Sequence, residues 1–135
     1  VAVPKLFGMI AKSKASEVPT AAGYYINLQD AYGLEANGAV GTWTQIGYSG
    51  PGSNSASGSQ SNVFLYTESA SAPQWNVKNT QKLNDCPQNQ AGAWTISVTA
   101  NKDAASGLTQ MSFTTGGVAT CTGLTPSFSQ LASVK

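Results

Sequence analysis

The first 37 residues constrain the fold most, because they carry the spacing of one long amphipathic helix. Apolar residues recur at steps of three and four, which places them on one helix face: Val18, Ala21, Tyr25, Leu28 and Tyr32. Asn37 and Gly38 form a stop signal, because both residue types tolerate the left-handed conformation that commonly ends a helix. The sequence therefore predicts a helix over residues 1–37 with a partner layer against its apolar face.

Pro19 leaves two alternatives for the course of this helix. A proline in a helix interior removes one backbone hydrogen bond and crowds the preceding turn, at a cost of about 3 kcal/mol. We therefore expect a kink in one continuous helix. The alternative is that a short first helix ends at Ser16 or Val18 and that Pro19 stands at the first position of a second helix, which proline tolerates.

The low charge content excludes several classes of function. A chain of 135 residues favours one domain, and only 10% of them are charged, against roughly 25% in ordinary soluble domains. Seven basic residues and a formal net charge of +1 give no footprint for phosphates, so we expect no nucleic-acid partner. Histidine is absent and the six carboxylates are scattered, so we predict no enzyme activity, no metal site and no cofactor.

The two cysteines, Cys86 and Cys121, lie 35 positions apart in the part of the chain that has strand-like patterns. Without histidine or further cysteines a zinc site would lack ligands. We interpret the pair as a disulfide that stabilises the fold by about 3–4 kcal/mol and that implies an oxidising compartment. Two buried free thiols are the alternative.

Strand signals begin after residue 61. Residues 62–69 alternate with period two, and a short strand or an irregular edge is expected around Trp75. Residues 93–100 and 108–116 alternate strictly, with Trp94 and Met111 on the apolar faces, and predict an antiparallel hairpin with one buried face.

Residues 38–61 are rich in Gly and Ser and are predicted to be a connecting loop. Its apolar residues Trp43, Ile46 and Tyr48 are expected to anchor it to the helix or the sheet. The expected fold class is α+β, with the helix packed on a small antiparallel sheet of three to four strands at residues 62–116. Residues 117–135 form a C-terminal loop, which a Cys86–Cys121 bond would tie down.

The N-terminal residues resemble those of a known family, the bacterial type IV pilins and their pseudopilin relatives. The resemblance is carried by VAVPKLFGM at residues 1–9 and AKSKASE at residues 11–17, which look like the middle of the pilin helix. Pro4 matches the kink proline of the family and Phe7 lies in its aromatic zone. The order of helix, loop, sheet and disulfide-closed C-terminal loop also fits, with Cys86 and Cys121 matching the pair that closes that loop.

The resemblance implies a structural subunit of an extracellular type IV pilus, with roles in adhesion or motility. Its partners would be further copies in a helical filament and the pilus assembly machinery in the membrane, and the full-length protein would be anchored in the inner membrane before assembly. The processing site, the spanning apolar segment and the near-terminal glutamate of the family are absent, so we expect a trimmed form that polymerises poorly. The residues expected to pack between subunits are Val1, Val3, Pro4, Leu6, Phe7, Met9 and Ile10.

Two alternatives accompany this hypothesis. One is a pseudopilin of a type II secretion system. The disulfide-closed C-terminal loop favours the pilus subunit over this alternative. The other is a minor pilin or adhesin that binds surface glycans through exposed aromatic residues, for which Trp43, Tyr48 and Trp75 are the candidates. Ile26, Leu34 and Tyr24 lie off the main helix stripe. They are interpreted either as subunit contacts or as residues that cover the edge of the domain's own core or contact the connecting loop.

Overall fold

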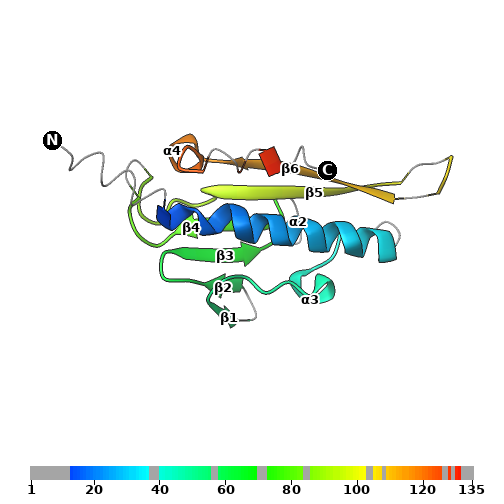
Figure 1. The fold of residues 1–135 in the computed structure, drawn as a ribbon, viewed down its shortest axis with the longest axis horizontal. Helices are drawn as coiled ribbons and strands as arrows, with labels where there is room; N and C mark the ends of the chain where they lie inside the picture. Colours follow the sequence, from blue (N-terminus) through cyan, green and yellow to red (C-terminus); the bar gives the residue numbers. More distant parts are fainter. Residues whose placement is uncertain are drawn as a thin grey trace.

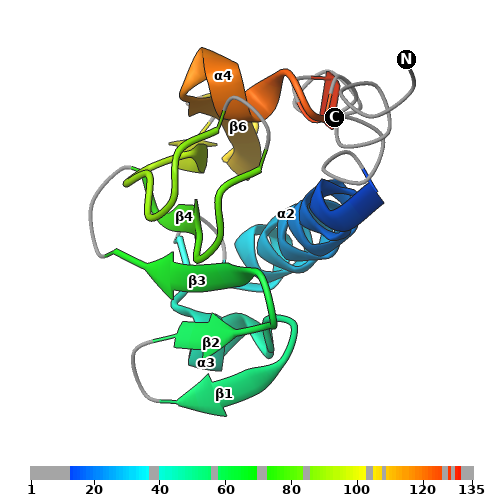
Figure 2. The same ribbon diagram turned by 90° about the vertical axis from the view of Figure 1, so that its left-hand side faces the viewer.

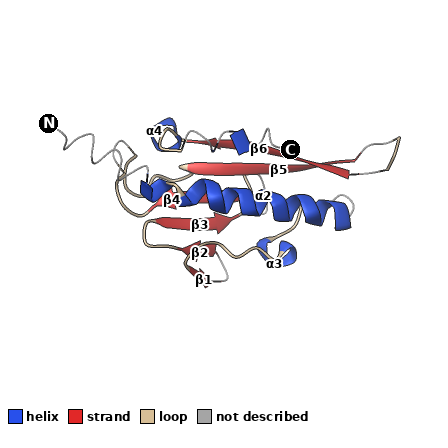
Figure 3. Ribbon diagram, viewed as in Figure 1, coloured by secondary structure: helices blue, strands red, loops and turns tan. Residues whose placement is uncertain are grey.

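The computed structural model describes residues 13–36, 40–55, 58–69, 73–83, 86–102, 105–107, 109–125, 128 and 130–131. Helix α2 (Glu17–Ala36) lies along one face of an antiparallel sheet, as Figures 1 and 2 show. The sheet has six strands in sequence order: β1 (Ser53–Ser55), β2 (Gly58–Gln60), β3 (Phe64–Glu68), β4 (Trp75–Asn79), β5 (Trp94–Lys102) and β6 (Thr109–Gly117). Two short helices, α3 (Trp43–Ile46) and α4 (Ala119–Thr122), flank it (Figure 3).

The prediction of three to four strands is wrong, because the sheet has six. The missed strands β1 and β2 lie in the Gly- and Ser-rich stretch that was expected to be a loop, and strand residues outnumber helix residues among the described elements. Ser53 pairs with Gln60, and Ser59 pairs with Tyr66 on β3. These short strands extend the sheet by backbone pairing, so they need no alternating apolar side chains.

The helix ends at Ala36, close to the predicted stop, but it is interrupted: residues 13–15 are helical, Ser16 is a turn, and α2 begins at Glu17. Ser16 forms a turn in which its N–H and hydroxyl both donate to the carbonyl of Ser13, at 3.3 and 2.6 Å. Pro19 is therefore the third residue of α2, inside the first turn, where a backbone N–H has no helical acceptor. The described residues therefore fit the alternative of a first helix that ends at Ser16 and not a kink at Pro19, although Pro19 stands at the third position of the second helix and not at the first. Residues 1–12 lie outside the described part of the chain.

The hairpin of β5 and β6 is confirmed, with nine paired residues on each strand from Trp94 opposite Gly117 to Lys102 opposite Thr109. Trp94, Met111 and Phe113 are buried, while residues on the opposite face are partly or fully exposed. This one-sided burial is the alternation expected for a sheet with one face against the core and one in water. Trp75 belongs to a regular strand, β4, which pairs with β3 and β5.

The segment between α2 and β1 is attached to the helix by a buried amide. Gln29 has no exposed surface, and its side chain donates to the Gly41 carbonyl at 2.7 Å and accepts from the Gly41 N–H at 3.1 Å. The adjoining helix α3 begins with a capping box between Thr42 and Gln45. The predicted anchoring of this segment is confirmed, since Trp43 and Ile46 are buried in the core.

A disulfide joins Cys86 to Cys121 in α4, with the two Cα atoms 4.6 Å apart. The predicted bond is therefore present, and free thiols are excluded for this pair. Downstream of α4, Phe128 is 1% exposed and stacks on Trp75 with ring centroids 6.2 Å apart. The indole N–H of Trp94 donates to the Thr125 hydroxyl at 2.8 Å. The C-terminal part is thus held by a covalent bond, an aromatic contact and a buried hydrogen bond.

Candidate functional site

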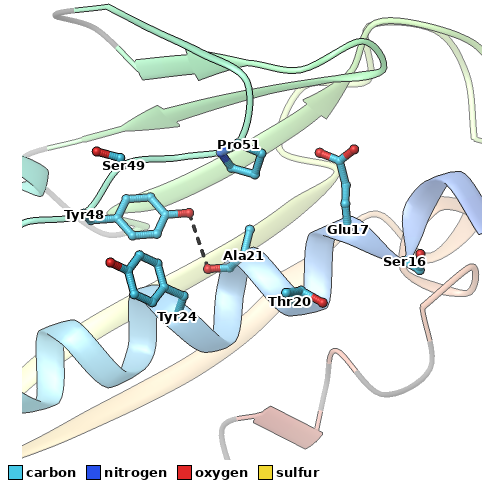
Figure 4. A pocket seen from close by; sticks show the side chains of 8 residues that line it. All are labelled: Ser16, Glu17, Thr20, Ala21, Tyr24, Tyr48, Ser49 and Pro51. Atoms are coloured by element: carbon cyan, nitrogen blue, oxygen red, sulfur yellow. Dashed lines mark hydrogen bonds between the residues drawn. The ribbon is translucent and has the colours of Figure 1, made fainter.

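A groove of about 420 Å³ separates the first half of α2 from the chain that leads into β1. Its lining residues are shown in Figure 4: Ser16, Glu17, Thr20, Ala21, Tyr24, Tyr48, Ser49 and Pro51. The volume lies in the range of about 300–1,000 Å³ that is typical of ligand sites, and such sites combine apolar walls with a few polar groups. This groove has that composition, with two tyrosine rings, a proline and one carboxylate.

One wall of the groove follows from the helical repeat. Glu17, Thr20, Ala21 and Tyr24 are spaced at i, i+3, i+4 and i+7, so their side chains stand on one face of α2. Tyr24 is 52% exposed, whereas Ala21 is buried. The helix therefore presents a carboxylate and an exposed aromatic ring two turns apart.

The opposite wall is the chain from Tyr48 to Pro51, which runs alongside α2 before it enters β1 (Figure 4). Gly52 ends this passage with a φ of 84°, a left-handed conformation, and a Cβ there would meet the carbonyl oxygen of Gln60. Glycine is therefore needed for the turn that leads the chain from Pro51 into β1, where β1 pairs with β2.

Tyr48 links the two walls through a short hydrogen-bond chain. Its hydroxyl accepts from the indole N–H of Trp75 at 3.2 Å and donates to the Ala21 carbonyl at 3.4 Å. Its ring lies 5.6 Å from Tyr24 and 5.3 Å from Tyr25, measured between centroids. Burial raises the pKa of Tyr48 to about 12, so the hydroxyl stays protonated and keeps its donor role near neutral pH.

Glu17 is the only carboxylate among the described residues that line the groove. Its Oε2 accepts from the hydroxyl of Tyr66 at 2.6 Å, a bond that joins α2 to β3. Burial, and then the bond to Glu17, raise the pKa of Tyr66 well above its ordinary value. The hydrogen bond from Tyr66 leaves the other carboxylate oxygen, Oε1, without a partner among the described residues, on the side chain that lines the groove.

The three aromatic residues proposed as a glycan platform do not form one. Trp43, Tyr48 and Trp75 are 6%, 5% and 0% exposed, and they pack around Tyr25 and one another in the core. Trp75 is covered because it stands on the inner face of β4, between α2 and Phe128. Of the three, only Tyr48 lines the groove, beside the exposed Tyr24.

The other predicted site residues fall in different places. Cys86 and Cys121 come together, while Val1, Val3, Pro4, Leu6, Phe7, Met9 and Ile10 lie outside the described residues. Ile26 is 3% exposed and belongs to the domain's own core. Glu17 and Pro51 were not singled out from the sequence. The spacing of Glu17 and Tyr24 indicates that both lie on one face of the helix. The position of Pro51 near that face depends on the course of the loop, which no sequence pattern indicates.

The described residues contain no cluster of three His, Cys, Asp or Glu side chains that would suit a metal ion. Over the same ranges, no helix combines the length and the apolar character needed to cross a membrane. Comparison with protein-family models, with curated proteins and with solved structures finds no match. A proposal about function therefore rests on the sequence and the structure of this chain.

Proposed function

We propose that this chain is a structural subunit of an extracellular filament of the type IV pilus kind, assembled through its N-terminal segment. The partners are other copies of the chain and the machinery that assembles the filament in the membrane. The pilin-like pattern of residues 1–17 suggests this role, and a disulfide suits the oxidising exterior of the cell. The buried aromatic residues give no support to the glycan-binding alternative.

The apolar character of the first ten residues is the observation that supports the proposal most. Among the described helical residues, Ser13 and Lys14 are exposed, whereas Ala15, Val18, Ala22 and Tyr25 form a buried stripe. Upstream of that stripe the sequence places six large apolar residues: Val1, Val3, Leu6, Phe7, Met9 and Ile10. If the apolar segment of one subunit binds a different surface on the next subunit, the contact is head-to-tail. Head-to-tail contacts build a helical fibre when the rotation from one subunit to the next does not close into a ring.

Immunogold electron microscopy tests this function. Antibodies raised against the 135-residue chain are applied to cells that make the protein from its natural gene, with cells lacking that gene as the control. Gold along long surface fibres is the expected result. Gold confined to the cell body, together with fibres that persist in the control cells, would refute the proposal. Short periplasmic assemblies would assign the chain to a secretion pseudopilus instead.

A further inference from the structure

The groove between α2 and the chain around Pro51 points to a defined occupant. We propose that it receives residues 1–12 of a second copy of this chain, with a lysine of that segment directed at Glu17 and its apolar residues against Tyr24 and Pro51. This inference rests on the proposed function, because it names the acceptor for the segment that joins the subunits.

Charge complementarity is the first argument. Three of the seven lysines, Lys5, Lys12 and Lys14, lie in the first 14 residues, and no acidic residue precedes Glu17. From Glu17 onward the chain carries two more acidic than basic residues. The chain therefore has a basic beginning and a mildly acidic body, which favours attraction between the beginning of one copy and the body of another.

The chemistry of the groove matches the same segment. Glu17 accepts a hydrogen bond from Tyr66, and a carboxylate that lines a groove together with aromatic rings favours a protonated amine. Tyr24 is the one large apolar or aromatic residue that is more than half exposed among the described residues. In the sequence VAVPKLFGMIAK each lysine lies within four residues of large apolar side chains. Such a segment can place an amine at the carboxylate of the groove and apolar side chains against its walls.

Photo-crosslinking with isotope-mixed protein tests the contact directly. The photoreactive residue p-benzoylphenylalanine replaces Tyr24 in the 135-residue chain, and equal amounts of ¹⁴N and ¹⁵N chains are mixed before illumination. Peptides in which position 24 of one isotope is joined to residues 1–12 of the other are the expected product. The same photoreactive residue at exposed Asn27, outside the groove lining, is the matched control and should give few such products.

Charge variants test the ion pair. Glu17→Gln keeps an oxygen that accepts from Tyr66, so the fold is retained while the charge is removed. Glu17→Gln and Lys12→Gln should each lower the mixed-isotope yield by about threefold, and the double variant should fall little further if the two groups pair. If the crosslinked peptides identify Lys5 as the partner of Glu17, the double-mutant cycle uses Lys5→Gln in place of Lys12→Gln. Lys82→Gln, at an exposed site away from the groove, controls for total charge.

Several results would overturn this inference. They are mixed-isotope products that avoid residues 1–12, yields unchanged by Glu17→Gln, or no intermolecular products even at the highest concentration at which the chain stays in solution, where a weak contact should still form. If immunogold still marks long fibres in that event, the groove assignment fails and the filament function stands. If neither fibres nor intermolecular products are found, both proposals fail.

Discussion

Removal of the disulfide gives the sharpest test of how the C-terminal part is held. Cys86 and Cys121 are 35 positions apart and have no exposed surface, so Cys86→Ala with Cys121→Ala deletes the link without burying a polar group. The chain-entropy model for a loop of this length predicts a loss of about 4 kcal/mol in the free energy of unfolding. The native fold should persist, because Thr125 still accepts from Trp94 and Phe128 still packs on Trp75.

Urea unfolding followed by tryptophan fluorescence measures this loss. The slope of free energy against urea should also rise, because an unfolded chain without the link exposes more surface. Reductant added to the parent chain should lower its stability by a similar amount and should leave the double variant unchanged. A loss below about 1 kcal/mol with an unchanged slope would refute the chain-entropy reasoning for this bond.

Three further predictions follow from the buried polar and aromatic groups. Gln29→Ala leaves the N–H and the carbonyl of Gly41 without their buried partner and should lower the free energy of unfolding in urea by about 2–4 kcal/mol. The control Gln45→Ala removes an exposed hydrogen bond and should cost under about 1 kcal/mol. Equal losses would contradict the role of Gln29 as a buried anchor of Gly41. Burial raises the pKa of Tyr25 and Tyr48 to about 12, so the stability they contribute is complete below about pH 10 and is lost as the pH rises through about 12. Near-ultraviolet titration of tyrosinate together with circular dichroism checks this, and ionisation of all tyrosines near pH 10 with the fold intact would contradict it. The three tryptophans are at most 6% exposed, so acrylamide should quench them weakly until urea unfolds the chain; strong quenching of the native protein would contradict their burial.

Much of the core was predictable because burial there follows a period. The strict alternation that includes Trp94 and Met111 identified β5 and β6, and the stop after Ala36 fixed the end of α2. The interpretation of Trp43 and Tyr48 as anchors of the loop is confirmed, but their use as a glycan platform was wrong. A single aromatic residue in a Gly-rich stretch carries no periodic signal, so its side chain can be assigned to the core or the surface only from the fold.

The sequence by itself determined a helix with one apolar face, a hairpin with one apolar face, and two cysteines available to link the end of the chain to the sheet. Only the tertiary structure decided that Ser53 and Gly58 begin strands, that Gln29 holds Gly41, and that Pro51 and Tyr24 line the same groove. These features depend on backbone hydrogen bonds and on contacts between distant residues. Side-chain periodicity records which face of an element is buried, but it does not record which distant segment covers that face.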